Sequence, residues 1–162
     1  MATLLELVRE GKLIRVDPQL GRSKFEERCL YLLPQAKQWI EVTLPGLGSS
    51  WKIEVSPNEQ LDALIFEFCS GEPLWVGKRF KCLTHLGDGI WQLKTADLRL
   101  FGWFLRRDNF IVSDCDSTDR IKKSNLYRGY CEQAVMRRDA LNLDEPKFVS
   151  GDNPDDVVSN CC

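Results

Sequence analysis

The stretch that decides the fold is IWQLKTADLRLFGWFL, residues 90–105. Its pattern predicts two short strands around a tight turn, because apolar and polar side chains alternate on both sides of a turn-forming segment. Lys94 and Arg99 lie among bulky apolar neighbours, an arrangement that suits a shallow cleft for an anion. A phosphate-bearing substrate is therefore the first candidate ligand. The alternative is two ordinary solvated charges on the outer face of a sheet.

The second strand of this hairpin, 98–105, has two distinct faces. Alternation places Arg99 on the side of Phe101 and Trp103, and Leu100 on the other side. Gly102 has no side chain to pack, so we expect a bend there or a close approach by another segment.

Two helices are expected before the hairpin. Ser56, Pro57 and Glu59 supply an N-cap, a first-turn proline and a capping box, and an apolar stripe then continues to a stop at Gly71. A second capping box, Thr3 with Glu6, predicts a short helix near the start of the chain. Alternating apolar residues in 39–44 and 51–55, on either side of the turn-rich linker PGLGSS, predict a further hairpin.

After the central hairpin, a turn at 106–109 leads to a strand at 110–114. A loop at 115–123 and a helix at 124–141 follow. Helices packed on a mostly antiparallel sheet make an α+β fold. Residues 142–162 are rich in acidic residues and are expected to form a flexible tail.

The composition excludes several classes of protein. The chain has 162 residues, a net charge of −2 and no apolar run long enough to span a bilayer, so a cytoplasmic protein without a membrane partner is expected. Seven cysteines without a CxxC pair, and the single His85, do not suit a zinc site or a disulfide framework. The glycine-rich phosphate loops and the hydrolase and metalloprotease motifs are missing, and we expect neither a metal nor a small-molecule cofactor.

Acidic residues raise two further possibilities. Asp114, Asp116 and Asp119 have an alternate spacing that could hold a hard cation, but the segment lacks the glycine and distal glutamate of a calcium loop, so a polar surface loop is preferred. The middle of the chain is basic and its end is acidic, so Asp152 to Asp156 could fold over the basic face and weaken anion binding. The alternative is a tail that is charged because it is solvated.

A cationic and aromatic set remains as the candidate chemistry. RNA is cut without a metal when its 2′-hydroxyl is aligned with the adjacent phosphate, given a base, cations for the extra charge on phosphorus and an acid for the departing oxygen. A lysine among other cations can act as the base, arginine suits the phosphorane, and an aromatic ring can stack on a nucleobase. The residues available for these roles are Lys94, Arg99, Arg106, Arg107, Arg120, Lys122, Lys123, Tyr127, Arg128 and Tyr130, with core packing preferred for Tyr130.

The segment LGDGIWQLKTADLRLFGWF (86–104), followed by a strand, a Lys-Lys pair and an alanine-bearing helix, resembles the RelE/ParE/HigB toxin superfamily, in particular its phage- and plasmid-type members. The resemblance covers about residues 51–141 and implies a RelE-like core. The fold expected from it has a mixed or antiparallel sheet of about four or five strands packed with two or more helices. Residues 1–50, a short helix plus strand, then form an N-terminal extension, and 142–162 form the tail.

Members of this superfamily are toxins paired with an antitoxin protein, and many cut mRNA on the ribosome. The resemblance implies catalytic roles for Lys94 as base, Arg99 as transition-state stabiliser, Lys122 for substrate charge and Tyr127 for stacking. The other basic residues would bind nucleic acid: Arg106, Arg107, Arg120, Lys123 and Arg128. Gln92 stands where some members carry another cation, so a non-catalytic member remains an alternative, such as an inhibitor of gyrase or another host factor, or a phage or plasmid regulatory protein. A third possibility is a structural or regulatory domain whose cations are all solvated.

Overall fold

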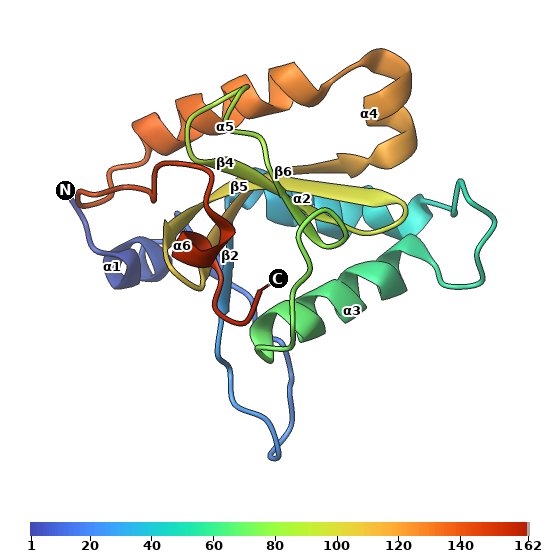
Figure 1. The fold of residues 1–162 in the computed structure, drawn as a ribbon, viewed down its shortest axis with the longest axis horizontal. Helices are drawn as coiled ribbons and strands as arrows, with labels where there is room; N and C mark the ends of the chain where they lie inside the picture. The colour runs from blue at the N-terminus through green and yellow to red at the C-terminus, as the bar shows by residue number, and fades with distance from the viewer. Residues whose placement is uncertain (162) are drawn as a thin grey trace.

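The predicted hairpin lies in the middle of a six-stranded mixed sheet (Figure 1). The computed structural model describes residues 1–161. The spatial order is β1-β2-β6-β5-β4-β3, in which only β2 and β6 are parallel neighbours. The bounds are β1 (Ile14–Arg15), β2 (Cys29–Leu32), β3 (Phe80–Cys82), β4 (Ile90–Lys94), β5 (Leu98–Arg106) and β6 (Asn109–Ser117).

The α+β class is confirmed, but the expected four or five strands were too few. The two edge strands account for the difference: β1 has two residues and β3 has three. Such segments are too short for alternation to distinguish them from a loop. β3 matters for the site, because it adds one more strand beside β4.

Helices cover both faces of the sheet (Figure 1). Helices α2 (Pro34–Val42) and α3 (Pro57–Cys69) pack on one face, over a cluster that includes Trp91, Leu100 and Phe104. Helices α1 (Leu4–Arg9) and α5 (Tyr127–Ala140) pack on the other, with Phe101 and Trp103. The two faces of β5 are therefore those predicted from its alternation. The short helices are η1 (Leu44–Gly46), α4 (Thr118–Ser124) and α6 (Pro154–Val157).

Both predicted capping boxes are confirmed. Thr3 and Glu6 cap α1, and Ser56 and Glu59 cap α3, with side-chain and backbone groups bonded reciprocally in each case. These bonds satisfy amide groups that have no partner inside the helix. Gly71 follows α3 with a φ of +77°, a conformation that favours glycine.

The hairpin predicted for 39–44 and 51–55 is wrong. Residues 39–42 belong to helix α2, which starts at Pro34 and buries Ala36, while Val42 is 71% exposed. The alternating apolar residues therefore do not mark the buried face of a strand, and the segment packs as part of a helix. Residues 51–55 form no strand; Trp51, Ile53 and Val55 are all exposed.

The loop predicted for 115–123 is also wrong. Strand β6 continues to Ser117, and α4 follows directly, capped by the Ser117 side chain. Asp114 and Asp116 are thus buried members of a strand rather than surface loop residues. Their spacing reflects strand alternation.

Gly102 lies where two strands approach closely, as its sequence position predicted. The register between β5 and β6 shifts between Phe101 and Gly102. A Cβ atom on Gly102 would lie 1.9 Å from the carbonyl oxygen of Ile111, a distance that no side chain can adopt. The bulge therefore requires glycine here.

Residues 142–161 pack against the body of the protein. Val157 and Val158 are buried in the cluster beneath α3. The fully buried Arg28 donates hydrogen bonds to the carbonyl oxygens of Phe68 and Ser159, and so joins this segment to α3. Among the described residues, none of the helices combines the length and the apolar character needed to cross a bilayer.

Candidate functional site

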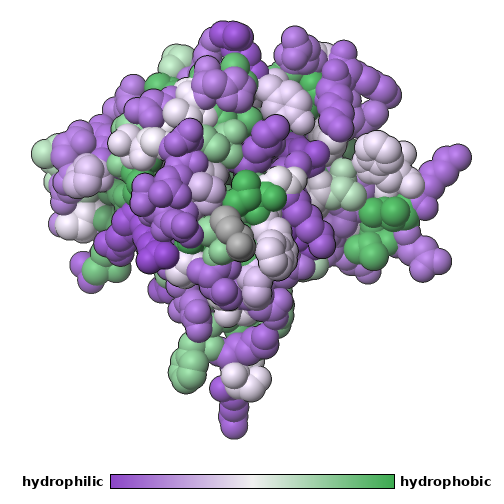
Figure 2. Space-filling view, viewed as in Figure 1, coloured by the Kyte–Doolittle hydropathy of each residue, from purple (hydrophilic) through white to green (hydrophobic). Residues whose placement is uncertain are grey.

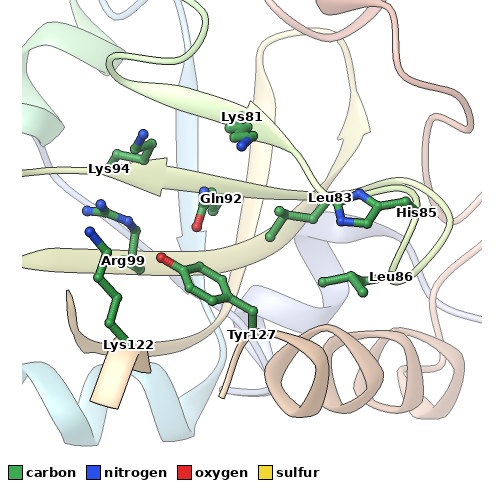
Figure 3. A pocket seen from close by; sticks show the side chains of 9 residues that line it. All are labelled: Lys81, Leu83, His85, Leu86, Gln92, Lys94, Arg99, Lys122 and Tyr127. Carbon is green, nitrogen blue, oxygen red and sulfur yellow. The ribbon is translucent and has the colours of Figure 1, made fainter. Parts of the chain in front are cut away.

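A cationic cleft of about 400 Å³ opens on the face of the sheet that carries α5, beyond the start of that helix (Figure 3). Lys94 on β4 is paired in register with Arg99 on β5, so both side chains leave the sheet on the same side. Lys81 on β3 is paired with Gln92 on β4 and extends the same surface. The cleft is lined by Lys81, Leu83, His85, Leu86, Gln92, Lys94, Arg99, Lys122 and Tyr127.

Arg99 is the buried centre of this cleft. The residue is 7% exposed, and its Nη1 donates hydrogen bonds to the carbonyl oxygens of Thr95 (2.6 Å) and Leu98 (2.9 Å). These bonds fix the guanidinium on the β4–β5 turn. Its Nη2 donates to no group in residues 1–161, and its buried Nε is without a partner, so donors remain for a ligand.

The acid in the turn beside Arg99 and the acid opposite it in register are held by other groups. Asp97, in the β4–β5 turn, accepts hydrogen bonds from Gln60 of α3 (2.6 Å) and from the Ser50 backbone (2.9 Å). Asp116, paired with Arg99 in register, accepts from Tyr130 (2.6 Å) and forms an ion pair with Arg120. Within residues 1–161, no ion pair involves any of the four cleft cations, which are Lys81, Lys94, Arg99 and Lys122.

The cleft also perturbs the protonation of Lys94. Partial burial lowers the pKa of Lys94, and the positive charges of Arg99, Lys81 and Lys122 lower it further. Its ammonium donates to the carbonyl oxygen of Gly77 at 2.8 Å. Cations that are close together without acids destabilise one another, and an anion in the cleft would relieve this repulsion.

Three groups from separate elements converge on the floor of the cleft. Figure 3 shows the ammonium of Lys122, the guanidinium of Arg99 and the hydroxyl of Tyr127 pointing toward one another. In the described chain, neither the Lys122 ammonium nor the Tyr127 hydroxyl has a hydrogen-bond partner, although the Lys122 ammonium lies 5.9 Å from the centre of the Trp51 ring. The buried Oε1 of Gln92 also has no partner and can accept a hydrogen bond. The cleft thus offers cations for a phosphate and an acceptor for a hydroxyl.

The structure brings together only part of the predicted set. All four residues predicted to be catalytic line the cleft: Lys94, Arg99, Lys122 and Tyr127. Tyr130 stacks on Phe101 with ring centres 4.9 Å apart, in line with the core role preferred for it, and its hydroxyl holds Asp116.

The residues predicted to bind nucleic acid lie outside the cleft. Arg106 and Arg107 are at the opposite end of β5, about 23 Å from Arg99, given seven residues at about 3.3 Å each. Arg120 is paired with Asp116, and Lys123 is paired with Asp119 at 3.0 Å. Arg128 is exposed in the first turn of α5.

Lys81 and His85 line the cleft but were not predicted as site residues. Lys81 lies on the three-residue strand β3. In the sequence, only the step from apolar Phe80 to charged Lys81 could have indicated a strand with Lys81 on its outer face. His85 lies in the loop between β3 and β4 and is exposed. Nothing in the sequence connects it to the hairpin except its closeness to Leu86 and Gly87.

The acidic tail does not cover the cleft, contrary to the expectation for Asp152 to Asp156. None of residues 142–161 lines it. The segment packs instead with Val157 and Val158 in the cluster on the α3 side. Residues 1–161 contain no cluster of three or more His, Cys, Asp or Glu residues suited to a metal ion.

No family model, curated protein or solved structure matches this chain.

Proposed function

We propose that the protein is an RNA-binding endoribonuclease that uses the cationic cleft to hold and cleave single-stranded RNA. The observation that supports this is the convergence of four cations without a carboxylate partner on one concave surface. An unpaired cluster of this kind costs folding free energy unless an anion binds to it. A polyphosphate chain supplies such an anion, and the Gln92 oxygen could accept a hydrogen bond from a ribose 2′-hydroxyl.

The reaction consistent with these groups is an internal transesterification. The 2′-oxygen attacks the adjacent phosphorus, the bond from phosphorus to the 5′-oxygen breaks, and the departing oxygen takes a proton from water, so the products are a 2′,3′-cyclic phosphate and a 5′-hydroxyl. Lys94, with its lowered pKa, accepts the 2′-hydroxyl proton in its neutral form. Arg99 stabilises the extra negative charge of the phosphorane, and Lys122 binds the substrate phosphate.

The biological setting is proposed from the resemblance of residues 86–104 to the RelE/ParE/HigB superfamily. It includes a RelE-like core, mRNA on the ribosome as the substrate, and an antitoxin protein as the partner. The order of elements from α3 through the β4–β5 hairpin, β6 and α5 is compatible with this proposal.

A non-catalytic binding protein with the same cleft is the second candidate. Two observations favour it. Gln92, which lies on β4 two residues before Lys94, is uncharged, and the Lys94 ammonium already donates to the carbonyl oxygen of Gly77, which favours its protonated form. Such a protein would bind a polyanion or an acidic surface of a host factor without cutting it.

A test is to add the purified protein to translating ribosomes and to map new mRNA ends. We expect 5′-hydroxyl and cyclic-phosphate ends with the wild-type protein, and a large loss of them with Lys122→Gln and Arg99→Ala. Arg22→Gln, an exposed change of equal charge in the loop between β1 and β2, should cleave normally.

The outcomes separate the candidates. RNA binding without new ends would support the second candidate. The absence of both binding and cleavage would refute the endoribonuclease and any role of the cleft in RNA binding. Thermal unfolding must accompany Arg99→Ala, since this change also removes the hydrogen bonds to Thr95 and Leu98.

A further inference from the structure

A second cavity adjoins the cationic cleft and has an exposed tryptophan at its edge. It has a volume of about 310 Å³ and is lined by Ser50, Trp51, Thr118, Asp119, Lys122 and Lys123. Lys122 lines both cavities, so the two spaces meet at its side chain. The loop between α2 and α3 that carries Trp51 projects from the body, and apolar side chains are exposed on it (Figures 1 and 2).

Trp51 is exposed but held in place. Its side chain is 61% exposed, whereas Trp91 and Trp103 are fully buried. The indole Nε1 donates to the carbonyl oxygen of Ala96 at 3.0 Å, and the neighbouring Ser50 backbone donates to Asp97 at 2.9 Å. Both acceptors lie in the β4–β5 turn, next to Arg99. The ring is therefore fixed to the same turn that fixes the guanidinium, which reduces the entropy lost when a flat ligand stacks on it.

The charges around Trp51 select the kind of ligand. The Lys122 ammonium lies 5.9 Å from the ring centre. A cationic ligand, which a tryptophan face could otherwise attract, would be repelled by Lys122 and by the cleft beyond it. A ligand that combines a flat aromatic group with a nearby negative charge suits both cavities. Thr118, which is 2% exposed, lines the second cavity, and its Oγ1 has no hydrogen-bond partner in residues 1–161.

We propose that Trp51 is a nucleobase-stacking platform that takes the base adjacent to the phosphate bound in the cationic cleft. This inference deepens the proposed function and rests on it. The substrate class is single-stranded RNA, because a base must leave its helical stack before it can lie on an aromatic side chain. The subsite gives little preference among bases, since every base has a π-face.

The test uses short single-stranded RNA with 2′-O-methyl groups, which block cleavage, and measures its affinity by fluorescence anisotropy. Trp51→Ala should weaken binding roughly 5- to 150-fold, the range of stacking contributions measured by alanine substitution. Trp51→Phe should restore part of the loss. Trp75→Ala, a change of an exposed tryptophan that lines neither cavity, should leave the affinity unchanged.

An abasic series provides the second readout. Removing one base at a time from the RNA should find a position whose loss weakens the wild-type protein but has no further effect on Trp51→Ala. Equal affinity of Trp51→Ala and the wild type, or the same abasic penalties in both, would overturn the stacking subsite while the cleft proposal stands. If the wild-type protein binds no RNA, the proposed function fails and the subsite fails with it.

Discussion

Replacing Lys122 with glutamine should change the salt dependence of RNA binding by a defined amount. Lys122 is exposed and forms no ion pair in the described chain, so the change should leave the fold intact. Each cation that neutralises a phosphate on a single strand contributes about −0.7 to the slope of log affinity against log salt concentration. The four unpaired cleft cations therefore predict a slope of about −2.8, and Lys122→Gln predicts about −2.1.

These slopes correspond to clear differences in affinity. A tenfold rise in salt concentration should weaken wild-type binding about 600-fold and Lys122→Gln binding about 130-fold. Anisotropy titrations of a non-cleavable RNA at several potassium chloride concentrations would measure both. Arg22→Gln removes the same charge outside the cleft and should keep the wild-type slope. A slope that is equal in Lys122→Gln and the wild type would show that RNA does not contact Lys122, and a slope reduced in Arg22→Gln as well would show that RNA binding is not confined to the cleft.

Three further predictions concern the bulge, the base and a buried acid. In urea denaturation, Gly102→Ala should lower the free energy of unfolding by at least about 3 kcal/mol, because the new Cβ would collide with the Ile111 carbonyl. Gly129→Ala, at a helical position with open space around it, should raise the free energy of unfolding by up to about 1 kcal/mol. The cleavage rate should rise with pH to a midpoint below 10.5, the ordinary pKa of lysine, because burial and the neighbouring cations lower the pKa of Lys94; Lys122→Gln, which removes one of these cations, should move the midpoint upward. A wild-type midpoint at or above 10.5 would contradict Lys94 as the base. Burial raises the pKa of Asp114 to about 6 despite its ion pair with Arg137, so the stability that the bound proton gives the folded wild type is lost as pH rises. The unfolding free energy of Asp114→Asn relative to the wild type should therefore increase by about 2 kcal/mol between about pH 4 and 7, and a difference that stays constant with pH would contradict this.

The strands of the central hairpin could be predicted because the residues that define them are close together in the sequence. Alternation along β4 and β5 continues over enough residues to identify each face, and the capping boxes of α1 and α3 involve neighbours in sequence. The failure at 39–42 has the opposite origin. A few alternating apolar residues are compatible with a strand, but Pro34 and the packing of Ala36 against the sheet favour a helix.

The meeting of Lys94 and Arg99 on one face followed from hairpin geometry alone. The absence of ion pairs between these two cations and nearby carboxylates, in the part of the chain that the structure describes, could not be predicted, because it depends on residues far away in the sequence. Asp97 is held by Gln60 of α3, and Asp116 is held by Tyr130 of α5. The position of Trp51 likewise depends on a bond from its loop to the β4–β5 turn. Arg106 and Arg107 were assigned to the site by charge, although the length of β5 separates them from Arg99.

The most direct test of the cleft is a crystal structure with a short RNA carrying 2′-O-methyl groups. We predict a phosphate within hydrogen-bond distance of the Arg99 guanidinium and the Lys122 ammonium, with the adjacent base on the Trp51 ring. RNA bound at another surface, with Arg99 and Lys122 contacting no phosphate, would contradict the account.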